Sequence, residues 1–65
     1  MDKDADFLTP KQAAQVLGVS MPVIYKILQR PGCPEVRVGR SYRIPRELFL
    51  MWLHEQAARG VDLLS

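Results

Sequence analysis

The sequence predicts a mainly α-helical fold with one β-hairpin, in the order helix, tight turn, helix, hairpin, helix. Three observations predict this order. Two short segments with apolar residues at helical spacing flank Gly18-Val19-Ser20, apolar and polar residues alternate over residues 36–44, and Pro45 precedes a third helical segment. We expect residues 1–65 to form a single small domain with a thin core.

Charge is segregated along the chain. Residues 1–10 carry a net charge of −2, residues 11–46 carry +6 and residues 47–65 carry −2, within a formal total of +2. Residues 1–6 would form an acidic N-terminal tail and residues 61–65 a short C-terminal tail. The basic middle of the chain indicates a polyanionic partner that binds one region. The alternative interpretation is a solvated basic face without a ligand.

Composition argues against several classes of protein. Cys33 is the single cysteine and His54 the single histidine, so neither an internal disulfide nor a structural zinc site is expected, and no cofactor is implied. The longest apolar run, LFLMWL, is too short to span a membrane, and the acidic start MDKDADF is unlike a signal peptide, so we expect a cytoplasmic protein. A chain of 65 residues leaves no room for a catalytic domain, so neither an enzyme nor a small-molecule substrate is expected.

Two short helices are expected on either side of a tight glycine turn. Thr9 suits the N-cap of the first helix, with Gln12 at the position that completes a capping box. Gly18 would end this helix, and Ser20 is the N-cap candidate for the second. The second helix should end near residue 29 or 30, because two prolines and a glycine follow within four residues.

The segment VRVGRSYRI is predicted to form the hairpin. Val36 and Val38 share one face of the first strand, and Tyr42 and Ile44 share one face of the second. To bring all four to the same side, Val38 must lie opposite Tyr42, which leaves Gly39-Arg40-Ser41 as a three-residue loop. In this register Val36 lies opposite Ile44.

This register has a consequence for the arginines. It places Arg37 opposite Arg43 on the outer face, with Arg40 at the tip of the hairpin. Like charges directly opposite each other on a sheet destabilise it by about 0.2 to 1 kcal/mol. A phosphate backbone would offset this repulsion, so the hairpin is predicted to bind a polyanion.

The third helix is expected to start at Pro45 and to end before Gly60. Its inward stripe is predicted to consist of Phe49, Trp52, Leu53 and Gln56. Residues 48–53 are apolar nearly all round, and one helix on so small a core cannot bury every side. We therefore expect an exposed protein-binding surface, whose candidate residues are Leu48, Leu50 and Met51.

In this order, LTPKQAAQVLGVSMPVIYKIL followed by VRVGRSYRIPRELFLMWL resembles the excisionase-type helix-turn-helix family, small winged helix-turn-helix proteins related to the MerR-like DNA-binding domains. The resemblance covers about residues 7–53, and its most specific parts are AAQVLGVS, Ile24-Tyr25-Lys26 and RVGRSYRIP. It implies that the second helix enters the major groove of DNA and that the hairpin, or wing, lies along the neighbouring backbone or minor groove. Members of the family act as recombination directionality factors, as prophage or transposon regulators, or as small transcription factors.

The resemblance also implies which residues bind DNA. The exposed face of the recognition helix would be Ser20, Met21, Pro22, Tyr25, Lys26 and Gln29. The wing would contribute Arg37, Arg40, Ser41 and Arg43. Additional phosphate contacts are expected from Arg30 and Arg46. The core of the helix pair would be Ala14, Leu17, Val19, Ile24 and Ile27.

Two departures from the family pattern refine the expected function. Met21 and Val23 stand where relatives often carry polar residues, so the recognition helix offers few side chains that can hydrogen-bond to base edges. Leu48 and Leu50 stand at positions that are usually polar in relatives, which favours a protein contact through the third helix.

We expect an excisionase, or recombination directionality factor, of bacterial or phage origin. Its partners would be double-stranded DNA, neighbouring copies of itself on the DNA, and an integrase. The first alternative is a small transcription regulator of the same fold. A more remote alternative is a protein-interaction adaptor that uses the apolar third helix and binds no nucleic acid.

Overall fold

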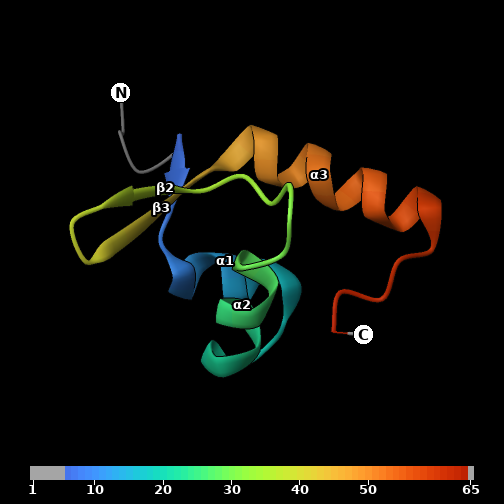
Figure 1. Ribbon diagram of the computed structural model, residues 1–65, viewed down its shortest axis with the longest axis horizontal. Coiled ribbons are helices and arrows are strands. Elements are labelled where there is room, and N and C mark those ends of the chain that lie inside the picture. Colours follow the sequence, from blue (N-terminus) through green and yellow to red (C-terminus); the bar gives the residue numbers. More distant parts are fainter. Residues whose placement is uncertain (1–5, 65) are drawn as a thin grey trace.

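The computed structural model describes residues 6–64, which form three helices and a small antiparallel sheet (Figure 1). In chain order the elements are β1 (Phe7–Leu8), α1 (Pro10–Leu17), α2 (Met21–Leu28), β2 (Val36–Val38), β3 (Ser41–Pro45) and α3 (Arg46–Arg59). The α1–α2 pair lies below the sheet in Figure 1, the β2–β3 hairpin projects to one side, and α3 runs away from it to the other. This is a winged helix-turn-helix, as predicted. Apart from Asp6, the predicted acidic tail lies outside the described residues.

The capping box of α1 is formed as its sequence predicts. The Gln12 backbone N–H donates to Thr9 Oγ1 at 3.2 Å, and the Thr9 N–H donates to Gln12 Oε1 at 2.9 Å. Gly18 ends the helix with a φ of 69°, a left-handed conformation that costs glycine little. Ser20 is the N-cap residue of α2, but its side chain makes no capping hydrogen bond there.

The core lies where the sheet, the helix pair and α3 meet. Phe49, Ile24, Leu28 and Ile44 are its largest fully buried side chains. Of the predicted core of the helix pair, Ala14, Ile24 and Ile27 are buried. Leu17 and Val19 are only partly buried against this cluster. In α3, Phe49 and Trp52 are buried as predicted, whereas the predicted inward residues Leu53 and Gln56 are only partly buried.

The strand β1 was not predicted from the sequence. It pairs antiparallel with β3, with Leu8 opposite Ile44 and Phe7 opposite Pro45. A strand of two residues is too short to show an alternating pattern, which is why the sequence does not reveal it. The strand extends the hairpin at its base, where Leu8 and its partner Ile44 are both buried.

The predicted register of the hairpin is wrong by one residue. Val38 lies opposite Ser41, Arg37 opposite Tyr42 and Val36 opposite Arg43, so the loop is the two-residue Gly39-Arg40. Gly39 has a φ of 62°, which suits the first position of a two-residue hairpin loop. The prediction required all four apolar residues to share one face. Because Leu8 supplies an apolar neighbour for Ile44, the valines are not needed there.

This register gives the wing two chemically different faces. Residues directly opposite each other in an antiparallel pair share a face, so Arg37 lies with Tyr42 on the inner face, next to the buried Ile44. Val36 and Val38, which were predicted to face inward, lie on the outer face and are 46% and 60% exposed. The predicted Arg37–Arg43 pair does not exist, because these two arginines lie on opposite faces.

Candidate nucleic-acid interface

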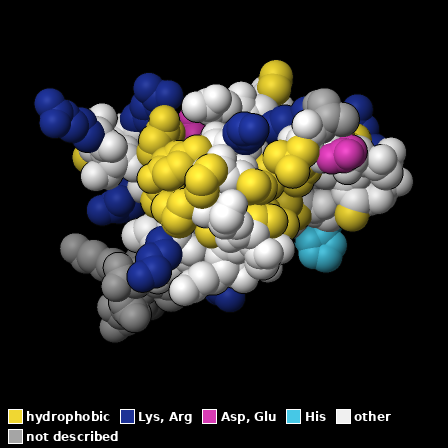
Figure 2. Space-filling view, turned by 90° about the horizontal axis from the view of Figure 1, so that it is seen from below, with side chains coloured by type: hydrophobic (Ala, Val, Ile, Leu, Met, Phe, Trp, Pro, Cys, Tyr) yellow, Lys and Arg dark blue, Asp and Glu magenta, His cyan; other side chains and the backbone are white. Residues whose placement is uncertain are grey.

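The exposed surface of α2 is the predicted one, and it mixes apolar with polar side chains. All six residues assigned to the face are exposed: Ser20, Met21, Pro22, Tyr25, Lys26 and Gln29. Figure 2 looks at the molecule from the side on which α1 and α2 lie and shows hydrophobic side chains gathered among separate Lys and Arg side chains. Met21 and Pro22, which lie in the first turn of α2, offer no side-chain hydrogen bond to a base edge. The role of the six residues in DNA binding stays a prediction.

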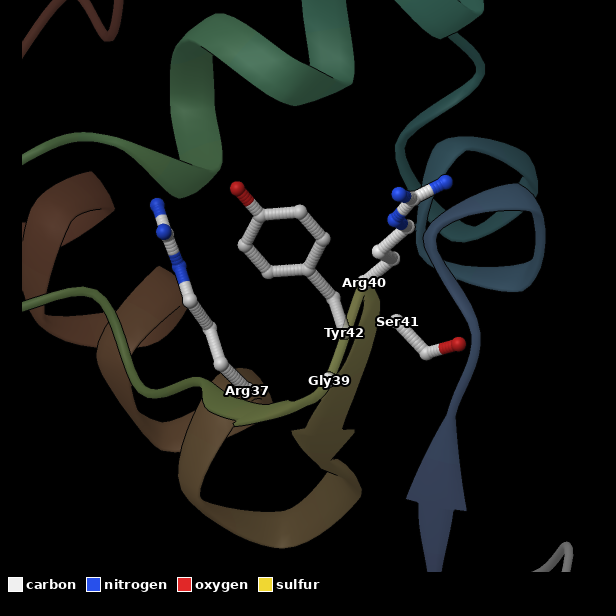
Figure 3. Close-up of a pocket in the computed structure, with 5 residues that line it drawn as sticks. All are labelled: Arg37, Gly39, Arg40, Ser41 and Tyr42. Atoms are coloured by element: carbon white, nitrogen blue, oxygen red, sulfur yellow. The ribbon is translucent and has the colours of Figure 1, made fainter.

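The inner face of the wing forms an open pocket of about 340 Å³ beside the helix pair. Its lining residues are Arg37, Gly39, Arg40, Ser41 and Tyr42. Arg37, Tyr42 and Arg40 extend from the hairpin toward the helices, with Tyr42 between the two arginines (Figure 3). Two guanidinium groups and a phenol hydroxyl offer hydrogen-bond donors of the kind that bind a phosphate.

Tyr42 connects this pocket to α2. Its ring centroid lies 6.0 Å from that of Tyr25, with the two rings tilted by 58°. On the other side, the guanidinium carbon of Arg37 lies 5.1 Å from the centroid of the Tyr42 ring, within the range of a cation–π contact. The cationic inner face of the wing and the exposed face of α2 therefore adjoin each other through one tyrosine.

Arg43 does not belong to this pocket, although it was predicted to bind DNA together with Arg37. It is exposed on the outer face of the wing, and its Nη1 donates to the Tyr42 carbonyl oxygen at 2.9 Å. Ser41 lines the pocket, but its side chain points away from the helices in Figure 3. Of the four predicted wing residues, Arg37, Arg40 and Ser41 line the pocket, whereas Arg43 lies on the opposite face. Their role in DNA binding stays a prediction.

The two additional phosphate contacts that were predicted lie outside the wing pocket. Arg30 follows α2, is half-buried and already interacts within the chain. Arg46 opens α3 and lines a second open hollow of about 350 Å³. The other lining residues of this hollow are Asp6, Phe7, Pro45, Glu47 and Leu48.

The predicted protein-binding candidates of α3 are exposed in part. Leu48 and Met51 are 54% and 59% exposed, whereas Leu50 is half-buried. Phe7 is 44% exposed and shares the second hollow with Leu48. Sequence reasoning missed Phe7, because its position beside α3 depends on the pairing of β1 with β3.

Sequence reasoning also missed Tyr42 as a site residue. The signal that could have identified it is the glycine at position 39. A glycine at the first position favours a two-residue loop, and a loop of Gly39-Arg40 puts Tyr42 opposite Arg37.

The cysteine shows no sign of nucleophilic chemistry. Burial, and secondly the charge of Glu35, raise the pKa of the Cys33 thiol to about 11. The thiol therefore stays protonated near neutral pH, and the thiolate is the reactive form.

Within residues 6–64, no group of three or more His, Cys, Asp or Glu side chains could hold a metal ion. No helix in the same part of the chain is long and apolar enough to cross a membrane.

Two helices joined by a glycine turn and followed by a basic wing define a DNA-binding helix-turn-helix protein. The model of a family described as a helix-turn-helix domain matches residues 7–57, and the chain belongs to this family. Comparison with curated proteins and with solved structures gives no match. DNA is accordingly the partner that this fold indicates.

Proposed function

We propose that the protein is an excisionase-type recombination directionality factor related to the MerR-like domains. It binds and bends attachment-site DNA in the cytoplasm of a bacterium, together with neighbouring copies of itself, and so assists an integrase in excising a phage or mobile element. The observation that carries the DNA interface is the wing pocket, in which Arg37 and Arg40 flank Tyr42 beside α2. The resemblance to excisionase-type proteins supports the biological role.

In this proposal α2 enters the major groove while the wing contacts the adjacent backbone. Lys26 and the backbone N–H groups at the start of α2 meet phosphates that border the groove. Arg37 and Arg40 bind phosphates beyond it, because the Tyr25–Tyr42 contact keeps the wing next to α2. Phosphate contacts position the protein without reading the sequence.

Sequence preference would come mainly from sources other than hydrogen bonds to bases. Met21 and Pro22 can contact a thymine methyl group, and Gln29 can pair with an adenine edge late in the helix. The cost of bending DNA depends on its sequence, so a protein that bends its site gains specificity at bases that it does not touch. A single copy is therefore expected to discriminate modestly between sites.

Contacts between neighbouring copies would add to this specificity. Phe7 and Leu48 line the hollow beside α3, with Asp6 and Glu47 among its other lining residues, and Met51 is exposed further along the helix. This hollow shares no lining residue with the inner-face pocket, so a neighbouring copy and DNA would use different residues. In the alternative function, a transcription regulator that binds as a dimer, the hollow beside α3 would form the contact between the two copies.

Footprinting distinguishes the two functions. Preferred sites are first selected from a random duplex library, and hydroxyl-radical footprints are then recorded on the selected DNA. An excisionase should protect one extended tract with repeats in phase with the helical turn, and occupancy should rise cooperatively with protein concentration. Protection of a single palindrome without extension would support the regulator instead. If no duplex is enriched or protected, both DNA functions are rejected.

A further inference from the structure

Tyr42 is the least exposed residue of the wing. Among residues 36–43, which form the hairpin beyond Ile44, every residue is exposed except Tyr42, which is half-buried. The strand β1 pairs with only Ile44 and Pro45 at the base of the wing, so the remainder is a two-stranded hairpin. Isolated two-stranded hairpins are at best marginally stable in water. Tyr42, which also packs against the core cluster, is therefore well placed to orient the wing.

The Tyr42 ring contacts a side chain of α2 and a side chain of β2. Its ring lies 6.0 Å from the ring of Tyr25 on α2, and the guanidinium of Arg37 on β2 lies 5.1 Å from its centroid. The three side chains thus run from the recognition helix across one wing strand to the other. A tilted aromatic pair and a cation–π contact both weaken quickly when the geometry is lost.

We propose that Tyr42 is a positioning residue that makes the recognition helix and the wing bind DNA as one rigid unit. The inference rests on the proposed DNA interface and extends it. Tyr42 sets the distance between α2 and the phosphate-binding arginines, and it orients Arg37 before DNA arrives. Tyr25 acts mainly as the anchor on α2 for this ring. Preorganisation of this kind raises affinity, because less conformational freedom is lost on binding.

If Tyr42 only stabilised the fold, its replacement would unfold the helices as well as the wing. Tyr42 is half-buried and packs against the edge of the core cluster, so circular dichroism must first show that the helices of each Tyr42 variant stay folded. The test compares Tyr42→Val, which keeps a β-branched side chain in the strand, with Tyr42→Phe, which keeps the ring. Arg43→Ala is the matched control on the outer face of the same strand.

We expect Tyr42→Val to weaken DNA affinity about tenfold, while Tyr42→Phe stays within about threefold of the wild type. The slope of log K against log salt should become shallower by about one in Tyr42→Val, since Arg37 no longer reaches its phosphate reliably. The affinity losses of Tyr25→Ala and Tyr42→Val should not multiply in the double variant, because either change alone breaks the same link. Wild-type affinity in Tyr42→Val, or losses that multiply, would overturn the proposal.

A second readout needs no DNA and separates this proposal from the proposed function. In Tyr42→Val the heteronuclear ¹⁵N NOE of the Gly39 and Arg40 amides should fall, while those of α2 stay at wild-type values. Arg43→Ala should leave the wing amides unchanged. If the wild type binds no duplex, the proposed DNA function fails, and these NOE values still decide whether Tyr42 holds the wing. Unchanged wing NOE values in Tyr42→Val would refute the coupling.

Discussion

Replacing Phe49 with alanine is expected to lower the free energy of unfolding by about 3 to 5 kcal/mol. Phe49 is completely buried and stacks on Trp52, with ring centroids 6.2 Å apart. Truncation of a buried phenylalanine costs about 3 to 5 kcal/mol, through lost burial and the cavity that remains. Domains are stabilised by about 0.05 to 0.15 kcal/mol per residue, so a chain of 65 residues has little stability in reserve. Urea unfolding followed by circular dichroism measures the loss.

The neighbouring residue provides the control for this experiment. Leu48 precedes Phe49 in α3 and is 54% exposed, so Leu48→Ala should change the free energy of unfolding by no more than about 0.5 kcal/mol. Equal destabilisation by the two variants would contradict the assignment of the inner and outer sides of α3. The two variants also separate folding from association, since Leu48 belongs to the surface proposed to contact a neighbouring copy.

The combined change Arg37→Ala and Arg40→Ala is expected to reduce affinity for every DNA sequence by about a hundredfold. Each guanidinium is assigned one phosphate, and a hydrogen bond to a charged group contributes about 1.5 kcal/mol or more, equivalent to roughly tenfold in affinity. Random and selected duplexes should be affected alike, because phosphates carry no sequence information. Fluorescence anisotropy with labelled duplexes gives the affinities, and thermal unfolding verifies that the variant is folded.

Arg43→Ala is the matched control for the Arg37 and Arg40 changes, because it also removes one arginine charge from the wing. Arg43 lies on the outer face of the wing, so its loss should change DNA affinity by less than about twofold at moderate salt, where distant charges are screened. Lys26→Ala should act differently from the wing variants, with a larger loss on the selected site than on random DNA. If Arg43→Ala weakens binding as much as Arg37→Ala does, the assignment of the inner face to DNA is wrong.

Local sequence signals predicted most of the fold. The capping box of Thr9 and Gln12 and the left-handed glycine at position 18 define α1 through interactions between residues close in the chain. The end of α2 follows equally from the prolines and glycine after it. These elements were predicted correctly because the residues that determine them are neighbours in sequence.

The error in the hairpin has a different origin. The prediction placed Val36 opposite Ile44, whereas Leu8 of β1, 36 residues earlier in the chain, is the apolar neighbour of Ile44. An apolar pattern within the hairpin alone cannot reveal a partner that distant. The consequence reaches the site, because a shift of one residue moves Arg43 away from Arg37 and brings Tyr42 to it. The exposed surface of α2 was predicted correctly, whereas the composition of the wing pocket was missed because the apolar pattern was given more weight than the turn signal of Gly39.

The salt dependence of DNA binding tests the central claim most directly. If Lys26, Arg37 and Arg40 each neutralise one phosphate, log K for the wild-type protein should fall with log salt concentration at a slope of roughly −3. The measurement is a series of anisotropy titrations of one selected duplex between low and moderate salt. A slope near this value supports a DNA interface built from α2 and the inner face of the wing. Failure to bind any duplex at low salt, or an affinity independent of salt, would contradict it.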